Sequence, residues 1–146
     1  LEEECAAPAI GPGERLFLNA DEARAMARGG MAIGSHTRGH RILSKLPFGE
    51  QCAELAGSRE ALQQTLGNDV DALAYPVGGR TCFDERTKDA ARAAGYRLAF
   101  SYYGGVNRPG SLDPLDVRRA QGGGGRGRGR FRFRVAMPLL MDGDWY

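Results

Sequence analysis

The sequence predicts an α/β fold built on parallel strands. Short apolar runs of strand length alternate with longer amphipathic segments, which can carry the chain back across a sheet. Glycine and proline stand at the ends of these segments, as expected for helix stops and strand ends. Strands joined by such crossovers pair in parallel, in a sheet or in a barrel.

The first half of the chain is expected to hold two helices and one strand. Asn19, with Glu22 three positions later, predicts the start of a helix over residues 20–28, which a glycine pair ends. Residues 31–34 are a short apolar run and a candidate strand. Residues 48–66 predict a long helix whose apolar face consists of Cys52, Leu55, Ala56, Leu62 and Leu66.

The second half repeats this pattern. An apolar run over residues 71–75 ends at Pro76, and residues 82–94 suit a further helix closed by glycine. Residues 96–100 are the next strand. Residues 116–120 are a weaker strand candidate after a loop rich in glycine and proline.

The predicted α/β domain covers residues 1–121. Residues 122–130 contain only Gly and Arg, cannot bury enough apolar surface to fold, and are predicted to be a flexible linker to a C-terminal segment, residues 131–146. The net charge of +2 gives no reason to expect a membrane or nucleic-acid partner for the folded body.

The cysteines indicate the redox state of the cellular compartment in which the protein works. Cys5, Cys52 and Cys82 have wide, irregular spacings, which argue against a disulfide framework and a cysteine zinc site. A reduced cytoplasmic setting is slightly favoured, and no stretch approaches the roughly 18 unbroken apolar residues of a membrane span. The chain opens at Leu1 without a signal-peptide pattern, and an export signal already removed is the alternative.

The two histidines, His36 and His40, are candidate metal ligands. They lie four positions apart, so that their rings can converge on one ion if the loop is tight. The alternative from spacing alone is a pair of surface or capping histidines. Topology favours the metal site, because His36 follows a predicted strand and ligands in parallel α/β folds lie at the carboxyl ends of strands.

Two further segments fall on the same predicted edge. Residues 75–79, Tyr-Pro-Val-Gly-Gly, follow the second strand, and residues 101–105, Ser-Tyr-Tyr-Gly-Gly, follow the third. A strand that simply ends at a proline is the alternative for the first of these segments.

Residues 34–40, Gly-Ser-His-Thr-Arg-Gly-His, resemble the metal-binding motif of the polysaccharide deacetylases, the NodB-homology carbohydrate esterases. In that family the motif follows a short strand, which a helix ending in glycine precedes. Residues 58–62, 73–78 and 93–100 resemble successive segments of the family. The resemblance therefore covers residues 19–121, in order.

The resemblance implies a partial or distorted (β/α) barrel that removes N-acetyl groups from a polysaccharide or amino sugar. In the family a divalent metal, usually Zn²⁺, polarises the acetamide carbonyl and acidifies a bound water. His36 and His40 match its two histidine ligands. Pro76 matches a groove motif in which the next N–H, here that of Val77, holds the oxyanion, and Tyr75 and Pro76 would contact the substrate.

Two departures from the family pattern make the site incomplete. The paired aspartates that supply the base and the third ligand are absent, and no histidine follows His40 to act as the acid. Asp84, Asp113 and Asp116 are better explained as helix-start or turn residues. The chain is therefore expected to be a fragment of a longer enzyme or a relative that has lost the chemistry.

Two other functions compete with this one. A non-catalytic carbohydrate-binding or structural remnant would use Tyr75, Tyr102 and Tyr103 to stack on sugar rings. Nucleic-acid binding by the Arg-Gly run is the second, and a solvated linker is favoured over it. Missing strands would also leave a sheet edge that a second copy of the chain can cover.

Overall fold

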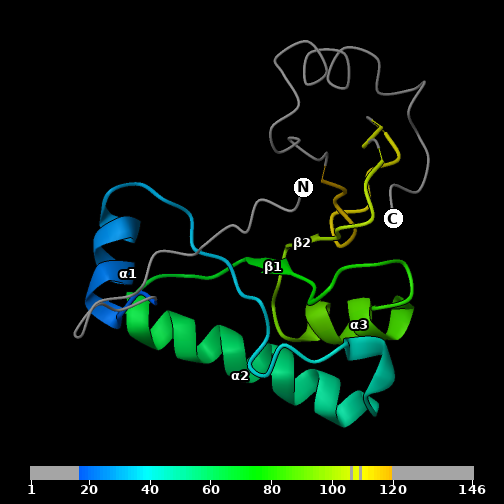
Figure 1. Ribbon diagram of the computed structural model, residues 1–146, viewed down its shortest axis with the longest axis horizontal. Coiled ribbons are helices and arrows are strands. Elements are labelled where there is room, and N and C mark those ends of the chain that lie inside the picture. The colour runs from blue at the N-terminus through cyan, green and yellow to red at the C-terminus, as the bar shows by residue number, and fades with distance from the viewer. Residues whose placement is uncertain (1–16, 106, 109, 120–146) are drawn as a thin grey trace, which may run out of the picture.

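The computed structural model describes residues 17–105, 107–108 and 110–119 (Figure 1). The longest helix runs along one side of two short strands, and the other α-helices lie toward its two ends. The elements are, in order, α1 (Ala20–Arg28), the 3-10 helix η1 (Leu43–Lys45), α2 (Phe48–Leu66), β1 (Ala72–Ala74), α3 (Glu85–Ala93) and β2 (Leu98–Phe100).

Local signals decide where α1 and α2 begin and end. The Asn19 side chain accepts a hydrogen bond from the Glu22 N–H, and the Glu22 carboxylate accepts one from the Asn19 N–H. α2 stops at Gly67, whose φ of 73° lies in the left-handed region that favours glycine. The helices predicted over residues 20–28 and 48–66 are confirmed.

The third helix, α3, begins at Glu85 and not at the predicted residue 82. Its N-cap is Asp84, whose carboxylate accepts a hydrogen bond from the Thr87 N–H at 2.9 Å. Cys82 and Phe83 precede the cap and are buried in the connecting loop. Asp84 is therefore a helix-start residue, as predicted.

The two strands pair in parallel, with Leu73 opposite Ala99. Isolated parallel bridges extend the pairing on both sides, from Ser35 to Leu73 and from Phe100 to Val117. Four parallel segments thus lie side by side in the order Ser35, β1, β2, Val117. The prediction of parallel strands is confirmed.

The strands predicted over residues 31–34 and 116–120 do not form among the described residues: single bridges stand at Ser35, just after the first run, and at Val117, within the second. The Met31 N–H still bonds to the carbonyl oxygen of Met26 in α1, at 3.1 Å. The first residue of the run therefore belongs to the end of the helix and does not pair with a strand. The described residues form an open set of parallel segments. Within these segments the α/β fold with parallel strands is present, and closure into the predicted partial or distorted barrel is not shown.

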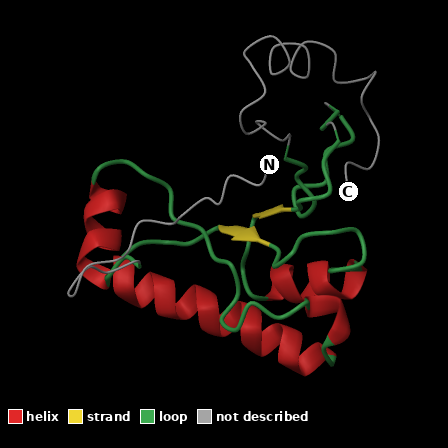
Figure 2. Cartoon of the chain, in the orientation of Figure 1, coloured by secondary structure: helices red, strands yellow, loops and turns green. Residues whose placement is uncertain are grey.

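The core lies between the strands and the helices α2 and α3, which cover one side of the sheet (Figure 2). Leu55, Leu73, Ala91 and Ala99 are fully buried and come from α2, β1, α3 and β2. Burying a side chain of leucine size stabilises the fold by roughly 1.5–3 kcal/mol. This packing fixes the strands and leaves the loops after them at the surface.

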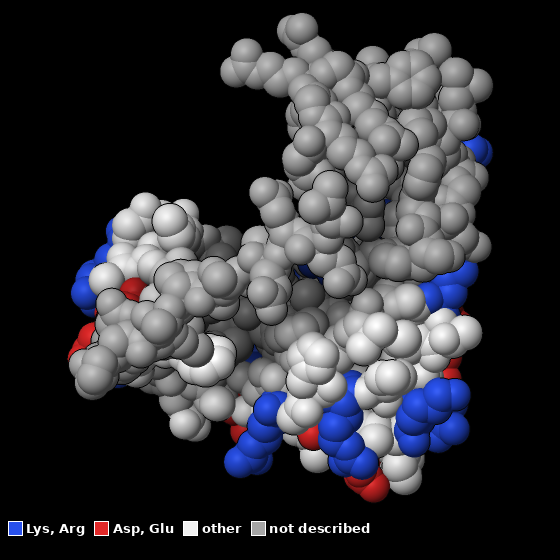
Figure 3. All heavy atoms as spheres, in the orientation of Figure 1, with Lys and Arg blue, Asp and Glu red and all other residues white. Residues whose placement is uncertain are grey.

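Charged side chains lie along the helical side of the molecule, Lys and Arg with Asp and Glu among them (Figure 3). Cys52 and Cys82 are free thiols. No helix in the described part of the chain is both long and apolar enough to span a membrane. The predicted linker at residues 122–130, the C-terminal segment at residues 131–146 and Cys5 lie outside the described residues.

Candidate functional site

The loops after three neighbouring segments meet at one edge of the sheet. His36 directly follows Ser35, Pro76 lies just after β1, and Ser101 directly follows β2. Because the segments are parallel, their carboxyl ends share an edge. The structure therefore brings together the three segments that the sequence pattern assigned to one place.

The rings of His36 and His40 lie against each other at this edge. Their centroids are 4.7 Å apart, the ring planes are inclined by 78°, and both residues are exposed. His36 Nδ1 lies 2.8 Å from the carbonyl oxygen of Ala74, which can only accept, so Nδ1 carries the proton in this hydrogen bond. The lone pair of His36 is therefore on Nε2.

The separation of the two rings is compatible with two ligands of one metal ion. A Zn–N bond of about 2 Å places the ring centre about 3.2 Å from the metal, so two rings at a near-tetrahedral angle lie roughly 5 Å apart. The observed 4.7 Å agrees with that value. The bond from His36 to Ala74 is of the kind that orients metal-binding histidines and fixes their tautomer.

The described residues supply these two candidate ligands and no complete centre. Among them, no group of three His, Cys, Asp or Glu side chains is placed to hold a metal ion. Asp113 pairs with Lys88 and accepts the Leu115 N–H, while Asp116 accepts a hydrogen bond from the Tyr103 hydroxyl. Both aspartates therefore have structural partners.

The loop that carries the histidines has an unusual backbone. Thr37 and His40 have φ values of 63° and 53°, in the left-handed region. Ser35 anchors the loop to α2, because its Oγ lies 2.8 Å from Ser58 Oγ. Glu54 of α2, which no sequence pattern singled out, accepts hydrogen bonds from two backbone N–H groups of the loop.

The turn after β1 holds Val77 in a strained conformation. Its φ of 61° is unfavourable for a β-branched residue, and the Gly78 N–H bonds to the Pro76 carbonyl oxygen at 2.6 Å, which closes a three-residue turn. Val77 is 55% exposed, and its N–H has no acceptor within the described part of the chain. This geometry is compatible with the oxyanion role, which stays a prediction.

The side chain of Tyr75, a residue predicted to contact a substrate, lies in the core. The residue is 1% exposed, its ring stacks on Phe83, and its hydroxyl donates to the carbonyl oxygen of Leu115 at 2.9 Å. Pro76 is also fully buried. Any contact of these two residues with a substrate would therefore involve the backbone.

A groove of about 560 Å³ lies beside Val77, a volume in the range of small-molecule sites. Tyr102 is 43% exposed there, whereas Tyr103 is buried, so Tyr102 is the tyrosine that remains open to a sugar ring. The Arg80 guanidinium lies over the Tyr103 ring, and that of Arg119 over the Tyr102 ring. The groove is lined by Val77, Gly79, Arg80, Thr81, Cys82, Tyr102 and Tyr103.

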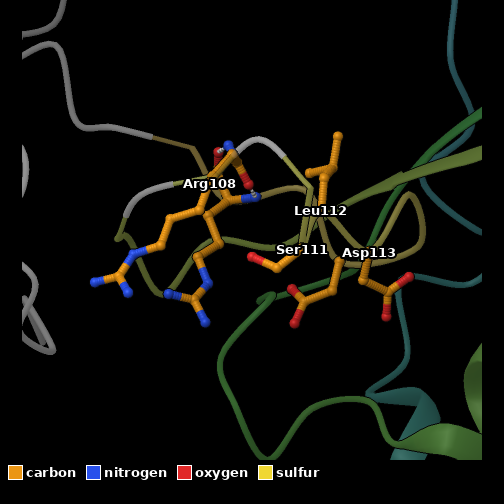
Figure 4. Close-up of a pocket in the computed structure, with 7 residues that line it drawn as sticks. Arg108, Ser111, Leu112 and Asp113 are labelled. Atoms are coloured by element: carbon orange, nitrogen blue, oxygen red, sulfur yellow. Dashed lines mark hydrogen bonds between the residues drawn. The ribbon is translucent and has the colours of Figure 1, made fainter.

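A second, polar cavity of about 330 Å³ lies in the loop between β2 and Val117 (Figure 4). Asn107 closes this loop through two hydrogen bonds with the backbone of Arg118, at 2.8 and 2.9 Å. Neither histidine lines this cavity, so it is distinct from the histidine pair. Its remaining lining residues are Arg108, Ser111, Leu112, Asp113 and Asp116.

The buried tyrosines near the groove are neutral at physiological pH. Burial raises the pKa of Tyr75, and the charges of Asp116 and Asp113 raise it further. Burial and the hydrogen bond to Asp116 likewise raise the pKa of Tyr103. Neither phenol is therefore suited to act as a general base.

Comparison with known proteins identifies relatives of one kind. Residues 11–99 match the family model described as polysaccharide deacetylase. The chain is 30% identical over 86 residues to YxkH of Bacillus subtilis (strain 168), whose name describes a polysaccharide deacetylase; the match covers 59% of this chain and 30% of YxkH.

Solved structures with a similar fold have related names. The Streptococcus pyogenes deacetylase PplD in complex with acetate has a TM-score of 0.66 at 24% identity, covering 74% of this chain and 46% of PplD. A polysaccharide deacetylase from Bacillus cereus has a TM-score of 0.61 at 26% identity, covering 70% of this chain and 32% of that protein. The chain thus spans less than half the length of each of these relatives.

Proposed function

The chain belongs to the polysaccharide deacetylase family, and on that premise we propose that it carries part of the active site of a metal-dependent hydrolase. The proposed reaction removes N-acetyl groups from a polysaccharide or amino-sugar substrate. The observation that carries this proposal is the pair of rings of His36 and His40, 4.7 Å apart at the edge where the strands end. The proposed metal is Zn²⁺, which imidazole ligands suit.

Each residue at this edge has a proposed role. The metal, when bound, would polarise the amide carbonyl and lower the pKa of a water molecule. His36 and His40 would hold it, with the Ala74 carbonyl keeping His36 in the required tautomer. The Val77 N–H would donate to the carbonyl oxygen as negative charge develops there. Tyr102 would contact the sugar ring in the groove beside Val77.

The third metal ligand and the general base are assigned to groups outside the described residues. This assignment follows from the structural partners that Asp84, Asp113 and Asp116 have within the described part of the chain. Two histidines alone make an open centre, short of the four ligands usual for zinc. The proposal therefore expects weak metal binding wherever the remaining groups are absent.

Acetate release tests this proposal. The chain would be incubated with Zn²⁺ and N-acetylated sugar oligomers, beside the double variant His36→Ala, His40→Ala and the surface variant Glu60→Ala. Because the described residues lack a third ligand, acetate release should be slow; whatever the wild-type chain releases should also be released by Glu60→Ala and be lost in the double variant. Equal acetate release by the double variant would contradict the role of the histidines.

A non-catalytic carbohydrate-binding function is the second candidate. It is favoured by the lack of a third ligand among the described residues and by the exposed ring of Tyr102 beside the groove. It predicts that the wild-type chain binds the same oligomers without releasing acetate. Tyr102→Ala should then weaken oligomer binding, while the histidine variants should leave it unchanged.

A further inference from the structure

We propose that Glu54 of α2 is a positioning residue that holds His40 in place beside His36. Glu54 Oε2 accepts the Arg38 N–H at 3.0 Å and the Gly39 N–H at 2.6 Å. A single carboxylate oxygen thus holds the two residues that lie between Thr37 and His40. The inference rests on the proposed function, because the position of His40 matters to chemistry only if both rings bind the metal.

The loop needs an external support because its backbone is strained. Thr37 and His40, on either side of the two bound N–H groups, both have positive φ values. Side chains other than glycine adopt this region rarely and keep it only where the surroundings impose it. Hydrogen bonds from the two N–H groups to an ionised oxygen are about twice as strong as neutral ones and can impose it.

The other supports of the loop are local. The Thr37 N–H donates to Ser35 Oγ at 3.3 Å, and the His40 N–H donates to Thr37 Oγ1 at 3.1 Å. With the two bonds to Glu54, all four consecutive N–H groups from Thr37 to His40 donate to side-chain oxygens. Of the three acceptors, Glu54 alone belongs to α2, so it fixes the position of Arg38 and Gly39 on that helix, as the Ser35–Ser58 contact fixes the start of the loop.

His36 does not depend on this carboxylate. Its ring is held by the hydrogen bond to Ala74, and it follows Ser35, which is bonded to β1. Loss of Glu54 should therefore release His40 and leave His36 where it is. The predicted consequence is a wider and more variable separation of the two rings.

Gly39 provides a second way to disturb the same contact. A Cβ on Gly39 would lie 2.8 Å from Glu54 Oε1, closer than Cβ atoms come to other groups. Because Gly39 does not have a positive φ, alanine is compatible with its backbone and would act mainly by displacing the carboxylate. Gly39→Ala should therefore reproduce the effect of removing Glu54.

The test compares three substitutions at position 54 with a matched control. Glu54→Ala removes the acceptor, and Glu54→Asp keeps the charge but withdraws the oxygen by one methylene. Glu54→Gln keeps an acceptor oxygen at the same reach. Glu60→Ala, at an exposed position of the same helix, controls for loss of a helical glutamate.

Two measurements are made on each variant. Zn²⁺ affinity is measured by calorimetry, and in the metal-free chain NMR measures the hydrogen exchange of the Arg38 and Gly39 amides and the proximity of the two imidazole rings. We expect Glu54→Ala and Glu54→Asp to weaken Zn²⁺ binding about 10- to 100-fold, as loss of a supporting contact does in metal sites. They should also speed exchange of both amides and weaken the ring-to-ring signal.

Glu54→Gln, which keeps the acceptor oxygen without its charge, should lose less than Glu54→Ala, and Glu60→Ala should match the wild type. Wild-type amide exchange and ring proximity in Glu54→Asp would overturn the inference, as would equal loss in Glu54→Gln and Glu54→Ala. If Glu54→Asp does not fold, Gly39→Ala takes its place, with the same expected and contradicting results. A wild-type chain that binds no Zn²⁺ would contradict the proposed function, and the metal-free measurements would still decide the role of Glu54.

Discussion

At the scale of single residues, Lys88 ties α3 to the loop after β2. Its ammonium lies 2.8 Å from Asp113 Oδ2 and 2.8 Å from Glu85 Oε1, and the residue is 8% exposed. Burial alone would raise the pKa of Asp113, but its hydrogen bonds with Lys88 and with the Leu115 N–H outweigh burial and lower it. Asp113 is thus held in its ionised form by the fold.

This ion pair predicts an acid limb in the stability profile, that is, a range of low pH over which the free energy of unfolding falls as pH is lowered. Because the folded pKa of Asp113 lies below its unfolded value of about 3.9, its contribution is present above that pH and is lost as pH falls through the folded pKa. Asp113→Asn should lower stability at neutral pH and flatten this limb, as measured by urea unfolding at a series of pH values. An unchanged acid limb in Asp113→Asn, compared with the surface control Asp89→Asn, would contradict the account.

The residues of the site differ in how far a sequence could reveal them. That His36 and His40 lie together was predictable from their spacing and from the strand before them, and their role as metal ligands stays a prediction. The burial of Tyr75 also had a signal, since it lies two residues after the core residue Leu73 and a strand places such pairs on one face. Glu54 had none, because its two N–H partners lie 15 and 16 residues away and only the packing of α2 brings them together.

At the scale of elements, the N-cap of α3 predicts that loss of Asp84 lowers the stability of the protein and leaves its Zn²⁺ affinity unchanged. Asp84→Ala removes the carboxylate that accepts the Thr87 N–H and should destabilise the protein by about 1 kcal/mol. Zn²⁺ affinity should be unchanged, because Asp84 caps a helix and is not a ligand. Thermal unfolding measures stability and calorimetry measures Zn²⁺ affinity. Weakened Zn²⁺ binding in a folded Asp84→Ala chain would contradict the purely structural role of this residue.

Contact between the loops after β1 and β2 predicts a second effect. Gly78 has a φ of 70°, and a Cβ there would lie 2.8 Å from both the backbone N and the Cβ of Tyr102. Gly78→Ala should therefore force the loops apart and cost about 1–3 kcal/mol of stability. Urea unfolding measures this loss of stability. Gly49→Ala is the control, because a Cβ at Gly49 meets no other atom within 4 Å. Equal stability of the two variants would contradict the close packing of the two loops.

The elements were predictable to the extent that local signals decide them. α1 and α2 have a capping box or a glycine stop, and both were placed correctly. The apolar run at residues 31–34 had the composition of a strand, but strand formation depends on a partner over several residues. Pairing begins only at Ser35, one residue after this run, so the strand predicted over residues 31–34 does not form.

At the scale of the whole molecule, one topological fact accounts for the site. Four parallel segments place their carboxyl ends at one edge, and the loops with His36, Val77 and Tyr102 follow three of them. The alternation of strands and helices was enough to predict this convergence. The described residues show neither closure into the partial or distorted barrel that the resemblance implied nor a third metal ligand beside the histidines.

The measurement that tests the central claim most directly is calorimetric titration of Zn²⁺ into the chain and into His36→Ala, His40→Ala and the double variant. The account predicts one ion bound per wild-type chain and a loss of affinity of about tenfold or more, roughly 1.4 kcal/mol, in each single variant. Affinity should also fall as pH is lowered, because ligand imidazoles must be deprotonated. Wild-type affinity in the double variant, or no binding by the wild-type chain, would contradict the claim that this pair is a metal site.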